Sequence, residues 1–290
     1  MDQIALIIST TLMYSTPLIF TALGGVFSEK SGIVNIGLEG MMVMGAFAGA
    51  AAGYFLGNPW LAFIIGGLAG GLFALIHAIA TVSFNADHTI SGVAINLLAP
   101  GVALFVSKMM FDGATMTPTI PMENKIPRPL NGLFPSGSVL DTIFNSYATV
   151  YLAFILVLVV WYVLYKTKFG LRVTAVGEHP GAADTLGISV TRVRYAAVII
   201  SGILAGLGGA SMSLAVVSSF RPTLISGQGY IAMAAVIFSK WRPQWAMVAC
   251  LLFGFSTALT VFFGNPELPF VVNENLLSMI PYIVTLIVLV

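Results

Sequence analysis

A long stretch without any charged side chain most constrains what this chain can fold into. No Asp, Glu, Lys or Arg occurs in the 47 residues between Glu39 and Asp87. One helix crosses a bilayer with roughly 20 apolar residues, so the stretch is long enough for two crossings. Three turn-forming residues in a row, Gly57-Asn58-Pro59, lie near its middle. The stretch therefore predicts a helical hairpin inside a membrane.

The rest of the chain is similarly poor in charge. Of its 290 residues, 58% are hydrophobic and 8% are charged, whereas soluble domains carry about 25% charged residues. This excludes a water-soluble fold and predicts an all-α, polytopic transmembrane helical bundle in contact with membrane lipid. We expect a single transmembrane domain over residues 1–290. The net charge of +1 gives no indication of a nucleic-acid partner.

Apolar runs predict about eight spans and one shorter helix. The spans are 4–27, 32–55, 60–84, 89–109, 147–165, 193–220, 244–263 and 274–290. Residues 229–239 are also apolar, but a helix of that length is only about 16 Å long and cannot cross alone. Because short helices of this kind line cavities in transporters, we predict a broken or half helix there.

The distribution of basic residues predicts which side faces the cytoplasm. The connection 166–194 holds five of the twelve basic residues, and short loops rich in Lys and Arg stay in the cytoplasm. Alternation then places the loop 110–146 and the N-terminus outside. If residues 229–239 run toward the cytoplasm, Lys240 and Arg242 also lie inside. A re-entrant path for 229–239 is the alternative, and it would reverse everything that follows.

Four polar residues in apolar surroundings are candidates for a solute pathway: Asn35, Glu39, Asn96 and Gln228. Glu39 is expected well inside the second span, where a charge costs several kcal/mol unless it is paired or wetted. It is either a functional group or a carboxylate that caps a broken helix or bonds a neighbouring span. For Asn96, interhelical hydrogen bonding is the simpler role. Gln228 precedes the short helix, whose N–H groups at Gly229 can face the oxygens of a ligand.

Residues 177–188 predict a short helix within the basic connection. Pro180 is a typical first residue of a helix and Gly187 a typical terminator. A docking helix for another subunit needs such a definite shape, although composition alone leaves a plain connection equally open. The candidate coupling residues are Glu178, Ala182, Ala183, Gly187 and Ile188.

Motifs for catalysis do not occur in the sequence. It has no Gly-Lys pair and hence no phosphate-binding loop of the Walker type. It also has no His-Glu-x-x-His or Gly-x-Ser-x-Gly pattern. We therefore predict a non-catalytic subunit without a cofactor or a metal, which takes its energy from elsewhere.

Two longer stretches resemble a known family. Residues 27–42 read Phe-Ser-Glu-Lys-Ser-Gly-Ile-Val-Asn-Ile-Gly-Leu-Glu-Gly-Met-Met. They resemble the N-terminal signature of permeases of ABC importers of the ribose/branched-chain amino acid class, most of all the nucleoside-importer branch. Residues 229–243 are similar to the late signature of that branch. Residues 178–188 resemble its coupling loop, with Ala182, Ala183, Gly187 and Ile188 at matching places.

The resemblance covers essentially the whole chain and implies an importer of guanosine or of nucleosides in general, working by alternating access. It implies a bacterial plasma-membrane location and three partners: an ATP-binding cassette ATPase inside, a substrate-binding lipoprotein outside, and a second, related permease. The chain resembles the shorter permease of such a heterodimer. The basic C-terminal tail typical of the family is missing, and because the chain ends at Val290 within an apolar run, we expect the natural chain to continue.

Two other functions remain open from the sequence. One is an importer of simple sugars or other small solutes in the same family. The other is an ion-coupled secondary transporter, which would require intramembrane carboxylates or an inverted repeat. The sequence shows one such carboxylate, Glu39, and no clear repeat.

Overall fold

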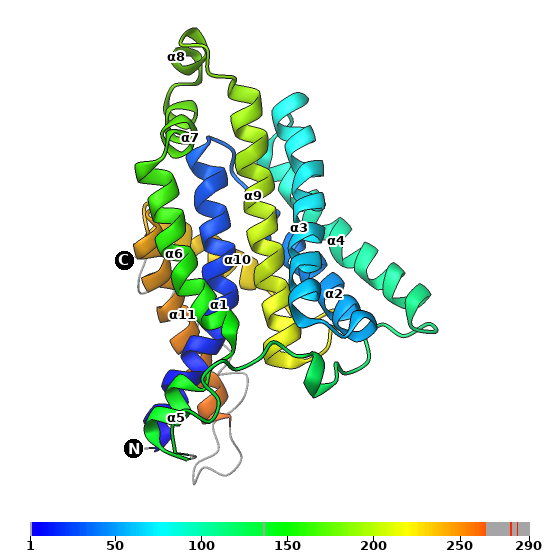
Figure 1. Ribbon diagram of the computed structural model, residues 1–290. Coiled ribbons are helices and arrows are strands. Elements are labelled where there is room, and N and C mark those ends of the chain that lie inside the picture. Colours follow the sequence, from blue (N-terminus) through cyan, green and yellow to red (C-terminus); the bar gives the residue numbers. More distant parts are fainter. Residues whose placement is uncertain (1, 136, 265–278, 280–282, 284–290) are drawn as a thin grey trace.

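The computed structural model describes residues 2–135, 137–264, 279 and 283 (Figure 1). Within these ranges the chain is helical and contains no strand. Seven of the described helices are long and apolar enough to cross a membrane, and an eighth apolar helix is shorter. This confirms the all-α polytopic bundle and seven of the predicted spans. The remaining predicted span, 274–290, lies outside the described residues except for positions 279 and 283.

The helical elements follow one another along the chain. They are α1 (Asp2–Lys30), α2 (Leu38–Leu56), α3 (Pro59–Ala78), η1 (Ile79–Ser83), α4 (His88–Met110), η2 (Met122–Asn124), α5 (Val139–Phe144), α6 (Ala148–Lys166), α7 (Lys168–Glu178), α8 (Pro180–Thr185), α9 (Val190–Ser211), η3 (Met212–Val217), α10 (Gln228–Phe238) and α11 (Pro243–Phe263).

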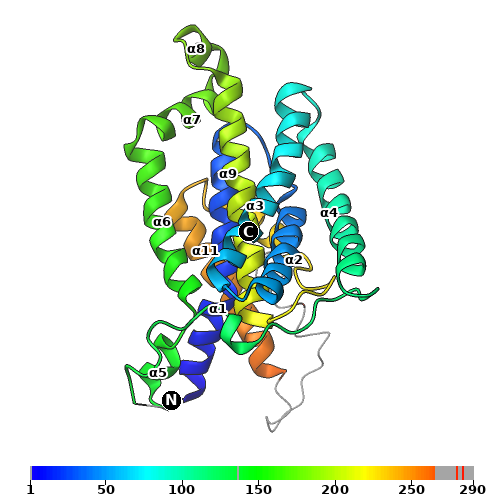
Figure 2. The same cartoon turned by 45° about the vertical axis from the view of Figure 1, so that its right-hand side comes forward.

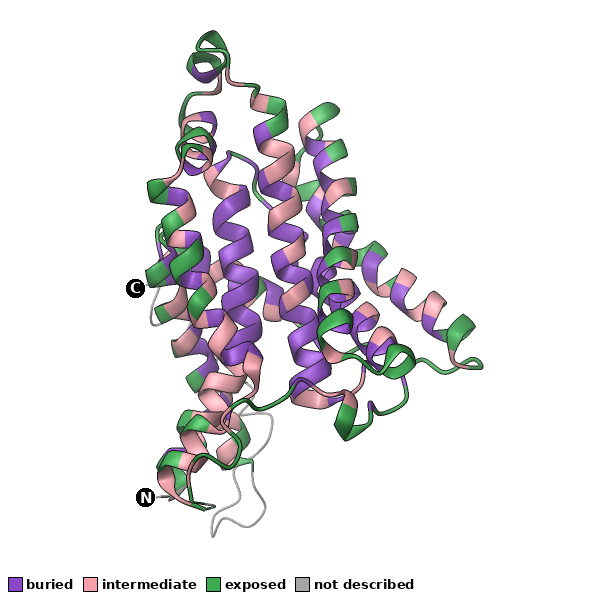
Figure 3. Cartoon of the chain, viewed as in Figure 1, coloured by how far each residue is buried: buried purple, intermediate pink, exposed green. Residues whose placement is uncertain are grey.

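The centre of the bundle contains α9 and the inner half of α1, which are largely buried in Figure 3. Small residues allow α2 and α3 to pack closely against α9. A Cβ atom on Gly45 of α2 would lie 2.2 Å from the carbonyl oxygen of Gly206, and one on Gly70 of α3 would lie 2.3 Å from that of Gly202. Such close backbone contact replaces the hydrophobic effect as a source of stability between helices in lipid.

Two of the bundle's crossings are made by interrupted helices. The prediction of a helix from residue 32 was wrong, because α2 begins only at Leu38. Residues 31–37 are non-helical, with Gly32 in a left-handed conformation at φ +86°, and their polar groups bond to neighbouring helices instead of to one another. Glu39 therefore lies in the first turn of α2, not well inside a helix. The predicted half helix is confirmed as α10.

The two ends of the bundle differ in character. One end carries α7 and α8, and the opposite end carries the N-terminus and α5 (Figures 1 and 2). We call the first the inner end, after the predicted cytoplasmic side of residues 166–194. Lys240 lines a pocket together with Lys30 and Gly177, so α10 also ends at the inner end. The re-entrant alternative for residues 229–239 is therefore wrong.

The path between α9 and α10 completes the seventh crossing. After η3, the chain bonds to the loop 110–146 at the outer end, where Phe220 N donates to Thr117 Oγ1 at 2.9 Å and Ile120 N donates to Ser218 O at 2.8 Å. Residues 221–227 then return toward the middle of the bundle, and α10 continues from there to Lys240. A non-helical segment and a half helix together span the bilayer.

The basic connection 166–194 contains more structure than predicted. The short helix from Pro180 is confirmed as α8, and Gly187 adopts a left-handed conformation at φ +77° directly after it. Helix α7 was missed. Together with the start of α9, the two helices bury a small apolar cluster of Val173, Val176, Ala183 and Val193, separate from the main core. This cluster gives the connection a defined shape.

Candidate solute pathway and coupling site

Glu39 links the two interrupted helices. Its Oε1 accepts a hydrogen bond from Gly227 N at 2.6 Å, and its Oε2 accepts one from Gly229 N at 2.7 Å. These N–H groups lie at the first turn of α10, where the helix dipole is positive. One carboxylate at the start of α2 thus caps the start of α10, more than 180 residues away in sequence. This is the capping role that the sequence left open for Glu39.

Glycine is needed where the two helices meet. A Cβ atom on Gly229 would lie 2.5 Å from both N and Cα of Glu39, closer than any side chain can approach a backbone. Gly227 has φ +93°, a left-handed conformation in which an L side chain is strained. Both N–H groups can therefore face the carboxylate only because neither residue carries a side chain.

Asn96 of α4 holds the start of α2 from the other side. Its Oδ1 accepts from Gly40 N at 2.8 Å, and its Nδ2 donates to Ile36 O and to the Tyr230 hydroxyl, both at 2.9 Å. The interhelical hydrogen bonding expected of Asn96 is therefore present. We call this set of contacts among Glu39, Asn96, Tyr230, Gly227 and Gly229 the junction.

The junction lies within the bilayer thickness rather than at its surface. Asn35 Nδ2 donates to Ser201 Oγ at 2.9 Å, and Ser201 is seven residues past Arg194 on α9, about 10 Å along the helix axis. Arg194 itself bonds Ser31 O at the inner end. Non-helical backbone at such depth occurs in membrane proteins only where protein or a water-filled cavity covers it.

Two of the predicted pathway residues keep an unused acceptor. Asn35 is fully buried and its Oδ1 has no hydrogen-bond partner, and the same holds for Oε1 of the half-buried Gln228. Gln228 stands in sequence between Gly227 and Gly229, the two glycines that donate to Glu39. In this conformation Gly229 N donates to Glu39, and the contact of these N–H groups with the oxygens of a ligand stays a prediction. A solute oxygen would have to displace the carboxylate or use the remaining amides.

The junction has an open side. The Tyr230 side chain is 44% exposed although its hydroxyl bonds to Asn96, and Leu97 next to Asn96 is 74% exposed. Ser226, just before α10, is exposed as well. Polar groups at this depth are unfavourable against lipid chains. This face of the chain is therefore suited to border either another protein or a wetted passage.

The segment 31–37 connects the junction with the inner end and is fixed along its length. Arg194 Nε donates to Ser31 O at 3.3 Å, and Ser28 Oγ donates to Ile33 O at 2.7 Å. Val34 N donates to His88 Nδ1 at 3.4 Å, and Val34 O is 3.4 Å from Nε2 of the buried His77. His88 and His77 thus hold the backbone of this segment through the N–H and the carbonyl group of the same residue, Val34.

Helix α7 packs against the inner end of segment 31–37. A Cβ atom on Gly177 would lie 2.1 Å from Lys30 O and 3.2 Å from Gly32 N. The last turn of α7 and the connection from α1 to α2 are therefore in direct backbone contact. Any displacement of α7 must move residues 30–32 or break this contact.

The predicted coupling residues are gathered at the tip of the inner end. Glu178, Ala182 and Gly187 are exposed, Ile188 is half-buried, and Ala183 packs into the small apolar cluster. Leu186, which the sequence analysis did not single out, is 80% exposed. Helix α8 projects beyond the other helices in Figures 1 and 2. The tip thus presents an apolar side chain on a defined, protruding support.

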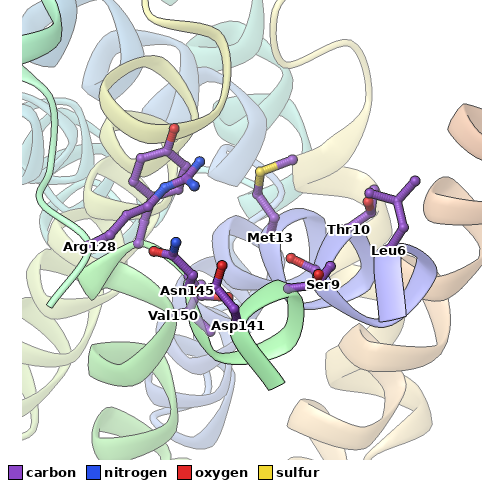
Figure 4. A pocket seen from close by; sticks show the side chains of 11 residues that line it. Leu6, Ser9, Thr10, Met13, Arg128, Asp141, Asn145 and Val150 are labelled. Carbon is purple, nitrogen blue, oxygen red and sulfur yellow. The ribbon is translucent and has the colours of Figure 1, made fainter. Parts of the chain in front are cut away.

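A separate pocket lies at the outer end. It has a volume of about 360 Å³ and is bordered by α1 and by the segment around α5, with Ser9, Arg128 and Asp141 among its lining residues (Figure 4). Ser9 is 16 residues from Gly25, the residue of α1 that faces Leu38, or about 24 Å along the helix. This pocket is therefore remote from the junction.

Comparison with known proteins places the chain in a family. Residues 7–289 match the family described as branched-chain amino acid transport system / permease component. The chain belongs to this permease family. It is a multi-pass membrane protein, in agreement with its seven apolar helices.

Several relatives are similar over nearly their whole length. The guanosine ABC transporter permease protein NupQ of Bacillus subtilis is 46% identical over 99% of this chain and 91% of the relative. The nucleoside ABC transporter permease protein NupC of Lactococcus lactis is 42% identical, over 99% and 92%. The putative glucose ABC transporter permease protein TsgC13 of Haloferax volcanii is 36% identical, over 98% and 90%.

Bacillus subtilis and Lactococcus lactis each also have a second, more distant relative of the chain. The guanosine permease NupP of B. subtilis and the nucleoside permease NupB of L. lactis are each 27% identical over 85% of this chain, which covers 72% and 70% of them. Each bacterium therefore has two related permease proteins that carry the same transport description.

Proposed function

We propose that this chain is the transmembrane permease subunit of an ATP-binding cassette importer that moves nucleosides across a bacterial plasma membrane. The observation that carries the proposal is the similarity to NupQ and NupC over 99% of the chain. The sequence supplies no nucleotide-binding motif, so ATP hydrolysis is assigned to a separate ATPase subunit. A substrate-binding lipoprotein is expected to deliver the solute at the outer end.

The junction is proposed to line the solute pathway. It joins two interrupted helices and has an open polar side at Tyr230, and Asn35 and Gln228, in the segments next to it, have unused amide oxygens. A nucleoside offers ribose hydroxyls and base N–H groups, which are donors for those oxygens. A second permease facing Tyr230 and α4 would close the pathway and shield these polar groups from lipid. The paired relatives in two bacteria support such a heterodimer.

Coupling to the ATPase is proposed to run from α8 to the junction. The exposed tip at Leu186 would contact the ATPase, and α7 would pass the movement to residues 30–32 through the contact at Gly177. Segment 31–37 would then shift Asn35 and the start of α2. The ATPase can change the pathway only through contacts that differ between the two states. Segment 31–37 can carry such a change, because Arg194 bonds its inner end and Asn96 bonds its other end.

A solute panel tests the proposed substrate. The complex is purified with its ATPase, its second permease and its binding protein, and uptake into proteoliposomes is measured for labelled guanosine, ribose and glucose. We expect guanosine uptake that other nucleosides inhibit and sugars do not. Glucose uptake that guanosine leaves unchanged would instead establish the sugar-importer alternative, which the similarity to TsgC13 supports.

A further inference from the structure

A cleft at the inner end is lined by basic and aromatic residues. It has a volume of about 640 Å³ and lies among the end of α1, α6, the turn between α10 and α11, and the start of α11. Its lining comprises three cations, three aromatic residues and one amide: Lys30, Lys240, Arg242, Trp161, Tyr165, Trp245 and Gln244. None of these lining residues is acidic, so the cleft attracts anions.

The backbone of the turn from α10 to α11 places Lys240 and Arg242 at the cleft. Lys240 and Trp241 both have left-handed backbones, at φ +49° and +56°, which side chains adopt only when the surroundings hold them there. Trp241 N bonds Val236 O at 3.2 Å, and Trp241 Nε1 donates to Glu29 Oε2 at 2.5 Å. The indole is thereby directed toward α1, and Lys240 and Arg242 border the cleft on either side of it.

Further positive charge comes from neighbouring groups. Helix α11 begins at Pro243, directly after Arg242, and its first N–H groups add the positive end of a 21-residue helix dipole. The Lys30 amine lies 5.4 Å from the centre of the Tyr165 ring, and the Lys166 amine lies 5.9 Å from that of Trp161. Glu29 and Glu178 line the adjoining pocket on the α7 side, which Lys30 and Lys240 also border, whereas Arg242 and Trp245 line the cleft alone.

The cleft lies on the α6 side of the bundle. Helices α6 and α4 lie on opposite sides in both Figure 1 and Figure 2, so the cleft is remote from the open side of the junction. Trp245 is 58% exposed and Tyr165 is 40% exposed. Aromatic residues of this kind mark the level of the lipid headgroups. Below them, α6 exposes an apolar stripe of Tyr162, Leu158 and Ile155, along which an acyl chain can lie.

We propose that this cleft binds the phosphate of an anionic phospholipid from the inner leaflet. The headgroup phosphate lies among Lys30, Lys240 and Arg242, the aromatic side chains flank the glycerol region, and an acyl chain follows the stripe on α6. Basic pockets between helices on the cytoplasmic side are suited to such headgroups. The lipid joins the end of α1 to the far end of α10, the half helix whose other end Glu39 caps.

The consequence for transport is a dependence on lipid charge. Helix α10 ends in the turn that carries Lys240, and it begins in the junction at Gly229. A bound headgroup fixes one end of this helix while the carboxylate of Glu39 fixes the other. Zwitterionic lipids carry the same phosphate together with a cation, so they bring no net negative charge to the three cations.

Lipid binding is tested on the intact complex purified in detergent. Native mass spectrometry and a titration with phosphatidylglycerol, phosphatidylcholine or water-soluble glycerol phosphate separate a lipid from free phosphate. We expect phosphatidylglycerol to remain bound and phosphatidylcholine to be lost. The double variant Lys240→Gln/Arg242→Gln should weaken phosphatidylglycerol binding about 25-fold, since each basic residue near the surface contributes roughly a factor of five.

Matched variants separate charge from folding. Lys240→Arg/Arg242→Lys keeps both charges and should retain binding, whereas Lys168→Gln/Arg172→Gln removes two exposed inner-end charges outside the cleft and should leave binding unchanged. Equal retention of both lipids, or unchanged binding in the Lys240→Gln/Arg242→Gln variant, would overturn the proposal. Competition by glycerol phosphate as strong as that of the lipid would also overturn it. The absence of bound phosphatidylglycerol in the complex with the ATPase docked would do the same.

Discussion

The junction and the inner tip are positioned by opposite means. At the junction, Glu39 and Asn96 make five hydrogen bonds to groups from α2, the segment before it and α10, and glycine contacts leave no space for a side chain. At the tip, α8 rests on a small apolar cluster and exposes Leu186 almost completely. The junction depends on exact geometry, whereas the tip depends on contact with a partner.

This difference indicates how the two regions should respond to mutation. Changes at the junction should affect solute movement even when ATP hydrolysis continues normally. Changes at the tip should leave the pathway intact and separate it from its energy source. The segment 31–37 belongs to both regions, because Arg194 holds one end and Asn96 holds the other.

The largest effect is expected from Gly229→Val. A Cβ at this position would lie 2.5 Å from backbone atoms of Glu39, so α10 must move away and lose both capping hydrogen bonds. We expect uptake to be abolished in proteoliposomes. Leu252→Val on the exposed face of α11 is the control for a β-branched side chain in a membrane helix, since Leu252 makes none of the contacts of the junction. Normal uptake by the Gly229 variant would show that the junction is not required.

Gly187→Val should uncouple the two regions. A β-branched residue at φ +77° costs about 1–2 kcal/mol and distorts the end of α8. We expect uptake to fall about tenfold or more while the ATPase in the complex remains active. Gly187→Asn, which tolerates the left-handed conformation better, should retain most of the uptake. Uptake equal to the unmodified chain in the Val variant would count against docking at α8.

Glu39→Gln should reduce uptake about tenfold without loss of insertion. The amide keeps one acceptor for Gly227 N or Gly229 N, but its NH₂ group faces the other donor, so one charge-assisted hydrogen bond worth about 1.5–3 kcal/mol is lost. Asp87→Asn, which keeps an acceptor for Ile90 N at the start of α4, is the control and should change little. Failure of assembly, seen as aggregation on gel filtration, would assign Glu39 a structural role alone.

Tyr230→Phe should have the smallest effect of the four. It removes one hydrogen bond, from Asn96 Nδ2 to the tyrosine hydroxyl, which contributes about 1 kcal/mol. We expect uptake to fall no more than about fivefold, with guanosine affinity affected more than the ATPase rate. Tyr162→Phe on the exposed face of α6 is the control. A greater loss than in Glu39→Gln would indicate that the hydroxyl contacts the solute directly.

The sequence predicted features that depend on local patterns. Apolar run length was sufficient for seven spans, and Pro180 with Gly187 was sufficient for α8. Helix α7 was missed although Phe169, Val173 and Val176 follow helical spacing, because the basic residues among them are equally typical of a charged connecting loop. For residues 229–239 the sequence left two paths open, and the positive charges of Lys240 and Arg242 favoured the path toward the inner end that the structure has.

The candidate site could not be assembled from the sequence in the same way. Glu39 was recognised as unusual, but its partners, Gly227 and Gly229, are almost 190 residues away, and no local pattern encodes that distance. The break at residues 31–37 was missed for a related reason. Its backbone groups bond to His77, His88, Asn96 and Arg194, and these tertiary contacts outweigh the helical tendency of an apolar run.

One measurement tests the central claim that this chain is a pathway powered through its inner end by a separate ATPase. Guanosine accumulation is measured in proteoliposomes that contain either the whole complex or this chain alone, with and without ATP. The account predicts accumulation only for the complex with ATP. Accumulation by the isolated chain, or accumulation that survives ATP removal and collapses with an ionophore, would contradict it.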